Sequence, residues 1–289
     1  MTHVAEEIAS QPACWEQAVT VAATAEGLPR VGERVAVIGC GTSLFIAQAY
    51  AALRESAGQG ETDAFPASEF PLHRAYDRVV AICRSGTTTE VLTALRATPL
   101  PTVAVIGDPD TPIVDAADQV VVLDFADERS VVQTRFATTA LTLLRAALGP
   151  VPGDLVGQAA EAVTAPLPAG AARRTQFTFL GAGWTTGLAH EAALKVREAS
   201  GSWTESYPAM EYRHGPISVT DGNSVVWFFG TPPEGLVADV EATGAIVSVS
   251  ELDPVADLIR AQRLAVEVAQ NRGLDPDRPR HLTRSIVLD

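Results

Sequence analysis

The sequence predicts an α/β protein in which parallel sheets are covered by helices on both faces, a doubly wound arrangement. Short runs that are apolar throughout alternate with longer helical patterns, and such strands are typical of parallel sheets buried on both sides. The order of strand, glycine-containing turn and helix also occurs twice along the 289 residues. An internal repeat of this kind indicates two similar halves.

The first half contains four apolar runs of strand length. Before them, residues 4–26 have the Ala- and Glu-rich pattern of an amphipathic helix that breaks near Pro12. The runs cover residues 34–39, 78–83, 101–108 and 119–125. Helical patterns follow the first two runs, and a further helix is expected over residues 130–148.

The second half repeats this plan in a shorter form. The stretch TQFTFLGAGWTTGLAHEAALKVRE (175–198) parallels ERVAVIGCGTSLFIAQAYAALRE (33–55), and two further strands are expected at residues 224–230 and 245–251. Pro, Gly and Ala concentrate between residues 149 and 172, which favours a domain boundary there. The expected organisation is an N-terminal helical segment (1–30), a first subdomain (31–150), a linker (151–172) and a second subdomain (173–289).

The composition restricts the classes of function. A formal net charge of −14 disfavours binding to nucleic acid, although a few local donors can still hold a small anion. Charged residues and glycines interrupt every hydrophobic stretch, so neither a signal peptide nor a membrane span is expected, and we predict a cytoplasmic protein. Cys14, Cys40 and Cys83 show no CxxC spacing, which argues against a metal site or a disulfide.

Two turns rich in hydroxyl groups follow the first two strands. The run 78–83 ends in Cys83-Arg84-Ser85-Gly86-Thr87-Thr88, and the run 34–39 ends in Cys40-Gly41-Thr42-Ser43. Either turn alone is consistent with an ordinary strand–helix connection or a helix N-cap. Because both turns lie at the carboxyl ends of parallel strands, we expect them to form one site for a phosphate monoester. Leu44 replaces the third glycine of a dinucleotide fingerprint, and no Walker lysine follows.

A set of charged residues lies on one face of the helix expected in the second half. Glu191, Lys195 and Glu198 are spaced i, i+4 and i+7, and Lys195 is the single lysine among 21 basic residues. Such a stripe is consistent with solvated ion pairs. It is also consistent with a carboxylate base in a pocket, supported by a cation.

Six motifs, in this order, resemble those of sugar isomerase (SIS) domain proteins: GCGTS, ASEF, SGTTTE, HEAALKVREAS, EYRHGPI and RPRHLTRSIVLD. The resemblance is to the isomerase half of glucosamine–fructose-6-phosphate synthase and to related phosphosugar isomerases and deaminases. It covers essentially the whole chain. It implies two flavodoxin-like SIS subdomains, a homodimer, a hexose or hexosamine 6-phosphate substrate, and no metal or cofactor.

The resemblance also implies roles for residues of the first half. Ser43, Ser85 and Thr88 match phosphate-binding positions, with Cys83 and Arg84 beside them. Cys83 stands where the synthase has Ser, and Arg84 stands where it has Gln, so Arg84 is expected to offer a charge-assisted contact. Val131 and Gln133 match a loop that contacts the sugar, with Gln133 in place of a Ser.

In the second half the resemblance implies the acid–base groups. Glu198 matches the group that moves a proton between C1 and C2, with Lys195 stabilising the enediolate or orienting Glu198. His214 matches a ring-opening group that reaches the site from the other subunit, although a lone histidine is also consistent with a structural role. Glu211 is a weaker candidate for orienting the site.

Two departures from the synthase restrict the reaction. Arg284 stands where the synthase has a lysine that forms a Schiff base, and a guanidinium forms no imine, so the catalytic role open to Arg284 is to stabilise the phosphate or the enediolate. Thr2 stands where a glutaminase would expose a cysteine, so glutamine-driven amino transfer is not expected. We therefore predict a phosphosugar isomerase or an amino-sugar-phosphate deaminase. The alternative is a non-catalytic phosphosugar sensor or regulatory protein.

Overall fold

The computed structural model describes residues 2–288, which form two compact units. The first unit holds residues 10–153 and 283–288, and the second unit holds residues 2–9 and 154–282. This division differs from the expected one at both chain ends. The helix α1 (His3–Ala9) belongs to the second unit, where backbone N–H groups of His3 and Val4 donate to the Asp277 carboxylate at 2.7 and 2.9 Å. The final segment belongs to the first unit through contacts described below.

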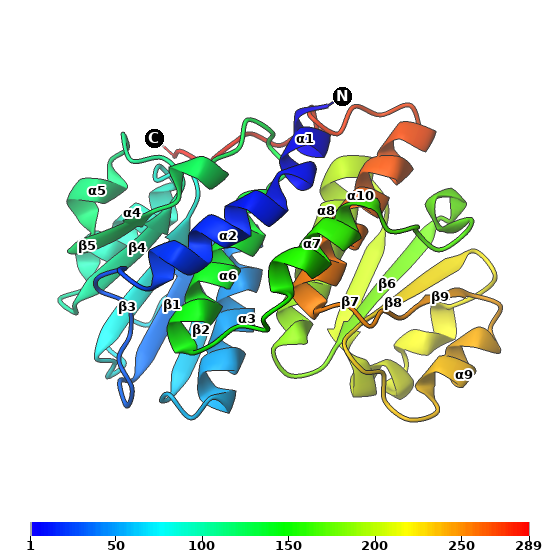
Figure 1. The fold of residues 1–289 in the computed structure, drawn as a ribbon, viewed down its shortest axis with the longest axis horizontal. Coiled ribbons are helices and arrows are strands. Elements are labelled where there is room, and N and C mark those ends of the chain that lie inside the picture. The colour runs from blue at the N-terminus through cyan, green and yellow to red at the C-terminus, as the bar shows by residue number, and fades with distance from the viewer. Residues whose placement is uncertain (1, 289) are drawn as a thin grey trace. The chain divides into compact units, whose positions relative to one another are not determined.

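The first unit is built on a five-stranded parallel sheet in the order β2-β1-β3-β4-β5 (Figure 1). All residues of its inner strands β1 and β4 are buried, as expected for strands that are apolar on both faces. Because neighbouring strands pair in parallel, their carboxyl ends share one edge of the sheet. The strands are β1 (Val35–Gly39), β2 (Thr62–Pro66), β3 (Arg78–Cys83), β4 (Thr102–Ile106) and β5 (Gln119–Val122).

The helices of the first unit pack in two groups. Helices α2 (Gln11–Ala22) and α3 (Thr42–Ser56) both pack against α6 (Arg135–Leu148), whereas α4 (Thr89–Ala97) contacts α5 (Ile113–Ala116). The buried Trp15 indole of α2 donates a hydrogen bond of 2.9 Å to the Thr138 hydroxyl of α6. The predicted fold class, parallel sheets covered by helices, is confirmed.

The second unit repeats this plan with a four-stranded parallel sheet in the order β7-β6-β8-β9. This order matches β2-β1-β3-β4 of the first unit, so the second copy lacks only the fifth strand. Helix α10 packs against both α8 and α7. The elements are β6 (Gln176–Gly181), β7 (Thr204–Pro208), β8 (Ser224–Phe229), β9 (Ile246–Ser248), α7 (Leu155–Thr164), α8 (Thr185–Ser200), α9 (Leu236–Glu241) and α10 (Pro254–Asn271).

Three details differ from the sequence patterns. The edge strands β2 and β7 are mostly half-buried, so neither has the apolar run of a central strand. The prediction of a helix from residue 130 is wrong at its start. The buried Glu128 carboxylate accepts hydrogen bonds from the N–H groups of Thr134 and Arg135, at 2.6 and 2.9 Å, and so caps α6 at Arg135. Finally, α7 lies within the region expected to be a linker.

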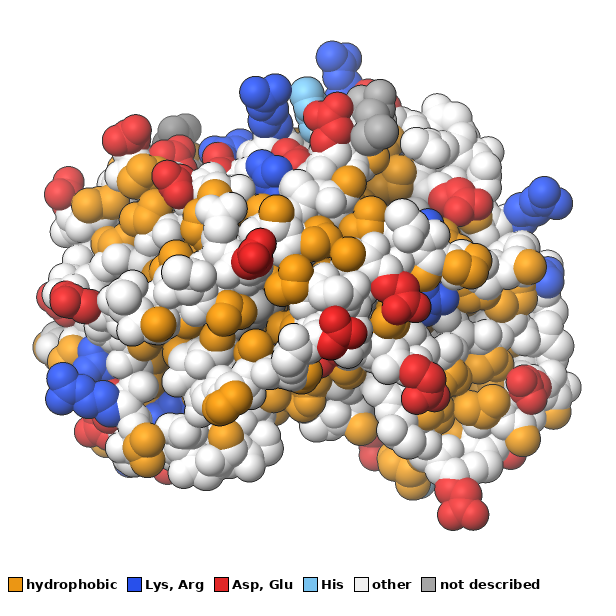
Figure 2. All heavy atoms as spheres, in the orientation of Figure 1, with side chains coloured by type: hydrophobic (Ala, Val, Ile, Leu, Met, Phe, Trp, Pro, Cys, Tyr) orange, Lys and Arg blue, Asp and Glu red, His pale blue; other side chains and the backbone are white. Residues whose placement is uncertain are grey.

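Acidic side chains are spread over the face drawn in Figure 2, among apolar and neutral ones, in keeping with the formal net charge of −14. Across residues 2–288, no helix combines the length and the apolar character needed to cross a bilayer. Cys14, Cys40 and Cys83 are all free thiols.

Candidate active site

The turn between β1 and α3 brings a small hydroxyl to the carboxyl edge of the first sheet. Gly39 ends β1, and a Cβ at this position would lie only 2.7 Å from the backbone carbonyl carbon of Ser43. Gly41 has a φ of 54°, a left-handed conformation that favours glycine. These two glycines let Ser43 lie against the strand end, where it is 4% exposed. Its hydroxyl makes no hydrogen bond within the described residues and is available to a ligand.

The turn between β3 and α4 lies beside the first one, because β1 and β3 are neighbouring parallel strands. The Ser85 hydroxyl accepts a hydrogen bond from the Thr87 N–H at 3.3 Å and lies 3.4 Å from the Thr88 hydroxyl. Gly86 has a φ of 61°, and a Cβ there would overlap the Thr111 side chain. Together with the first N–H groups of α4, which lack intrahelical partners, these hydroxyls form a setting suited to an anion. We call residues 40–43 and 83–88 the hydroxyl cup.

Two cysteines stand at the strand ends beside the hydroxyl cup. Burial raises the pKa of the Cys40 thiol to about 11, and the negative charge of Glu90 adds to the shift. Cys40 is therefore a neutral thiol at neutral pH. The buried Cys83 has its Sγ 3.9 Å from the Ser85 hydroxyl. Since a thiol is a weak donor, Ser43, Ser85 and Thr88 supply the strong side-chain donors.

The C-terminal segment 283–288 lies against the β3–α4 turn. The Thr87 hydroxyl donates to the Ser285 hydroxyl at 3.0 Å, and the Thr89 N–H donates to the Ile286 carbonyl at 3.1 Å. The tail therefore adds a further hydroxyl next to the hydroxyl cup. The sequence analysis did not single out Ser285, although it lies within a motif that pointed to the family.

Arg84 does not offer its guanidinium to the hydroxyl cup. The side chain is completely buried and donates to the carbonyls of Ser130 and Arg284, at 2.9 and 2.8 Å. It also lies 3.8 Å from the buried Glu128 carboxylate. Arg84 thus joins the loop before α6 to the C-terminal tail. Its charge-assisted contact with a phosphate stays a prediction, and Nη1 and Nη2 would have to leave these two carbonyls to make it.

Arg284 is engaged in the same network. Its Nη2 lies 2.6 Å from both carboxylate oxygens of Asp127, and its Nε donates to the Glu128 carbonyl at 3.2 Å. The guanidinium therefore anchors the tail to the loop after β5.

The loop that carries Val131 and Gln133 also belongs to the first unit. Val131 is half-buried and contributes no polar side-chain group. The Gln133 Oε1 is buried and has no hydrogen-bond donor within residues 2–288. Such an orphaned acceptor costs about 1–3 kcal/mol, and a ligand hydroxyl in reach would remove this cost.

In the second unit, the charged stripe of α8 is a buried cluster rather than a solvated one. The Lys195 Nζ lies 2.5 Å from Glu198 Oε2 and 3.5 Å from Glu191 Oε1. Lys195 and Glu191 side chains are 1% and 0% exposed, whereas Glu198 is 19% exposed. Lys195 therefore holds Glu198 by one oxygen. The other oxygen, Oε1, makes no hydrogen bond within the described part of the chain.

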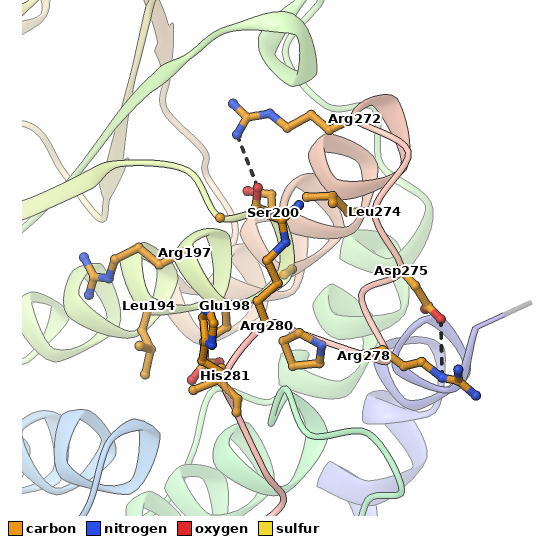
Figure 3. A pocket seen from close by; sticks show the side chains of 14 residues that line it. Leu194, Arg197, Glu198, Ser200, Arg272, Leu274, Asp275, Arg278, Arg280 and His281 are labelled. Carbon is orange, nitrogen blue, oxygen red and sulfur yellow. Dashed lines mark hydrogen bonds and ion pairs between the residues drawn. The ribbon is translucent and has the colours of Figure 1, made fainter.

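Glu198 lies in the wall of a pocket of about 830 Å³ in the second unit (Figure 3). The lining residues come from the last turns of α8 and from residues 272–282, which follow α10. In Figure 3 the side chain of Arg280 lies between Glu198 and His281 on one side and Asp275 and Arg278 on the other. The pocket thus combines one partly exposed carboxylate with several basic side chains.

The predicted residues fall into two groups. The hydroxyl cup, Val131, Gln133 and Arg284 belong to the first unit, and Glu198, Lys195 and His214 belong to the second. His214 ends the 3-10 helix Ala209–His214, where its side chain is exposed. It does not line the Glu198 pocket of its own chain.

Comparison with known proteins gives relatives of one kind. No family model matches the chain. The glutamine–fructose-6-phosphate aminotransferase of Methanothermobacter thermautotrophicus is 29% identical over 89% of this chain and 52% of its own length. That of Pyrobaculum aerophilum is 33% identical over 38% of this chain and 23% of its own length. The chain thus spans about half the length, or less, of the curated relatives it matches.

Solved structures agree over nearly the whole chain. The crystal structure of glucosamine-6-phosphate deaminase from Thermotoga maritima matches 99% of this chain and 100% of its own, with a TM-score of 0.84 and 25% identity. The chain has the sugar isomerase (SIS) fold. A second SIS structure, the tagatose-6-phosphate ketose/aldose isomerase of Escherichia coli, matches 99% of this chain and 96% of its own, with a TM-score of 0.75 and 20% identity.

The resemblance predicted from six short motifs is confirmed. The relatives of this SIS chain are aminotransferases matched over the isomerase part, and its structural neighbours are phosphosugar isomerases and a deaminase. The names of these relatives and neighbours specify phosphorylated sugars, and the fold they share with this chain is the SIS fold.

Proposed function

We propose that this SIS protein interconverts the aldose and ketose forms of a hexose or hexosamine 6-phosphate, with loss of ammonia when the substrate carries a 2-amino group. The observation that carries the proposal is the Glu198 carboxylate, which lies in the wall of a pocket and forms an ion pair with the buried Lys195. The names of a structurally similar deaminase and isomerase support this class of reaction.

The phosphate of the substrate binds in the hydroxyl cup of the first unit. Ser43, Ser85 and Thr88 donate to its oxygens, together with N–H groups in the first turn of α4 other than that of Thr89, which donates to Ile286. A phosphate monoester carries about −1.5 to −2 charge at neutral pH, so these donors form charge-assisted hydrogen bonds. A hydroxyl group of the sugar donates to the otherwise unpaired Gln133 Oε1.

Glu198 then moves the proton that isomerisation requires. Its Oε1 takes the proton from C2 of the open-chain aldose and returns it to C1, while the proton of the C2 hydroxyl moves to the C1 oxygen. Lys195 is a positioning residue, since it holds Oε2 and is itself buried. With a 2-amino substrate the same transfer gives a C2 imine, to which water adds as ammonia leaves.

Ring opening uses His214, which the resemblance assigns to a second copy of the chain. The exposed side chain of His214, outside the Glu198 pocket of its own chain, supports a homodimer in which the partner supplies it. In this proposal the dimer acts in the cytoplasm on a free sugar phosphate, without metal or nucleotide.

A panel of hexose and hexosamine 6-phosphates, assayed for ketose formation and for free ammonia, tests the proposed function. At least one substrate should be converted, and Glu198→Gln should lower its turnover by at least about 10²-fold. Glu241→Gln, at an exposed position of α9, is the matched control and should retain activity. Thermal stabilisation by a sugar phosphate without any conversion would instead favour the phosphosugar sensor.

A further inference from the structure

The proposed proton transfer lacks a positive group at the reacting carbons. Removal of the C2 proton produces an enediolate, and a fixed cation beside its oxygen lowers the barrier. The two cations suggested by the sequence are engaged elsewhere. Lys195 is 1% exposed between two carboxylates, and Arg284 is paired with Asp127 in the first unit.

The Glu198 pocket contains one arginine that remains available. Three of its arginines have partners: Arg197 donates to Thr204, Arg272 donates to the Ser200 carbonyl, and Arg278 lies 4.0 Å from Asp275. Arg280 lines the same pocket and makes no hydrogen bond or ion pair within residues 2–288. Its guanidinium is therefore an uncommitted positive charge in the pocket that holds the carboxylate (Figure 3).

The backbone next to Arg280 has an unusual conformation. Residues 278–282 all line the Glu198 pocket, and Arg280 and His281 form a turn within this segment. His281 has a φ of 62° and, within the described residues, is the one non-glycine position with positive φ. This left-handed residue therefore lies in the pocket wall directly after Arg280, and such conformations are concentrated at functional sites.

We propose that Arg280 is the group that stabilises the enediolate, which deepens the proposed function and rests on it. When Glu198 Oε1 takes the C2 proton, the electron pair left behind delocalises onto the C1 oxygen, and Arg280 donates hydrogen bonds to that oxyanion. The guanidinium keeps its own protons throughout. The proton on Glu198 returns to C1, and the charge on the oxygen is lost.

Substitution at Arg280, with an exposed arginine outside the pocket as control, tests this role. Arg280→Gln should lower kcat by about 10²–10³-fold with little change in KM, because the interaction develops only after the substrate is bound. Arg280→Lys should retain part of the activity. Added guanidinium should partly restore Arg280→Ala, which it would not do if Arg280 only supported the fold. Arg96→Gln, an exposed change in the last turn of α4 and outside the Glu198 pocket, should leave kcat unchanged.

A binding measurement separates failure of this inference from failure of the proposed function. The probe is the hydroxamate of a pentonic acid 5-phosphate, whose anionic oxygens mimic an enediolate. The wild type should bind this hydroxamate at least about 10-fold more tightly than Arg280→Gln. Equal affinity, or a kcat of Arg280→Gln equal to that of Arg96→Gln, would overturn the role of Arg280. If the wild type converts no sugar phosphate, the proposed function fails, and the hydroxamate affinities alone decide whether Arg280 forms an oxyanion site.

Discussion

The same strand–helix turn is built twice in this molecule, and the two copies are used differently. Gly39, Gly41 and Ser43 in the first unit correspond to Gly181, Gly183 and Thr185 in the second, and the φ angles of Gly41 and Gly183 are 54° and 56°. The hydroxyls differ. Thr185 accepts from the Ala182 N–H at 2.8 Å and donates to the Phe229 carbonyl at 2.9 Å, whereas Ser43 makes no such bond within the described residues. We call the second turn closed, because its hydroxyl is hydrogen-bonded to backbone groups, and the first turn open, because its hydroxyl has no such bond.

The neighbouring turns follow the same division. Counted from the strand registers, Ile38 pairs with Ala81 and Leu180 pairs with Phe228, so Pro232 and Gly235 take the places of Ser85 and Thr88. Neither residue has a hydroxyl. The edge of the second sheet therefore offers fewer side-chain donors to an anion than the hydroxyl cup of the first unit does.

The helices after these turns show the reverse pattern. Counted from Ser43 and Thr185, the positions of Glu191, Lys195 and Glu198 in α8 correspond to Ala49, Leu53 and Ser56 in α3. The charged cluster thus exists in the second copy alone. A duplicated unit can thus place different side chains on equivalent positions, and in the proposed function these differences assign binding to one copy and proton transfer to the other.

The largest effect is expected at the charged cluster. Lys195→Met leaves the Glu191 carboxylate buried without its cation and should lower the free energy of unfolding by about 3–5 kcal/mol. Urea unfolding measures this change. The double variant Lys195→Met with Glu191→Gln should recover part of the loss, since it removes the buried charge. A single variant as stable as the wild type would show that the cluster is hydrated.

The open and closed turns should respond oppositely to loss of their hydroxyls. Ser43→Ala should weaken sugar-phosphate binding by about tenfold or more and leave stability unchanged, because its hydroxyl bonds only the ligand. Thr185→Val should cost about 1–3 kcal/mol of stability by leaving buried backbone groups unpaired. Its effect on phosphate affinity should be small. Calorimetric titration and thermal unfolding of both variants check this, and identical profiles would remove the distinction between the units.

A smaller effect is expected at the tail of the first unit. The Arg284–Asp127 pair is 38% and 31% exposed, so Arg284→Gln should cost about 1 kcal/mol or less. The tail should nevertheless open more often, since Arg284 contacts both Asp127 and the Glu128 carbonyl. Hydrogen exchange of the Leu288 amide, which donates to Thr89, should become faster than in the wild type. Unchanged exchange would mean that the backbone contacts alone hold the tail.

The smallest effect concerns His190 on α8. Burial, with the positive charge of Arg197, lowers the pKa of His190 below its usual 6.5. The unfolded chain then binds the proton more readily than the folded chain, so stability should fall as the pH drops below about 6.5. His190→Gln should flatten the pH dependence of the melting temperature in this range. A steeper dependence in the variant would contradict the assigned direction.

The sequence predicted the central strands because they are apolar on both faces. The fold class, the repeat and the shorter second sheet all followed from runs such as 35–39 and 176–181. The edge strands β2 and β7 escaped prediction because half-buried strands carry no continuous apolar signal. The start of α6 depends on the Glu128 carboxylate, which no local pattern reveals.

The candidate site was predictable in its residue types more than in its contacts. The hydroxyl-rich turns were visible because glycine and hydroxyl residues cluster at strand ends. The hydrogen-bond partners of Arg84 and Arg284 could not be predicted, since these partners lie 46 and 157 positions away in the chain. The importance of Arg280 could not be read from the sequence either, because it depends on which other cations are already paired.

The most direct test is a calorimetric titration of the Glu198→Gln variant, which should bind substrate without converting it. The ligands are fructose 6-phosphate, fructose and inorganic phosphate. We expect fructose 6-phosphate to bind, fructose to show no measurable binding, and the added change Ser85→Ala to weaken fructose 6-phosphate by about tenfold or more. Equal affinity for fructose and fructose 6-phosphate, or an unchanged affinity after Ser85→Ala, would contradict a phosphate site in the first unit.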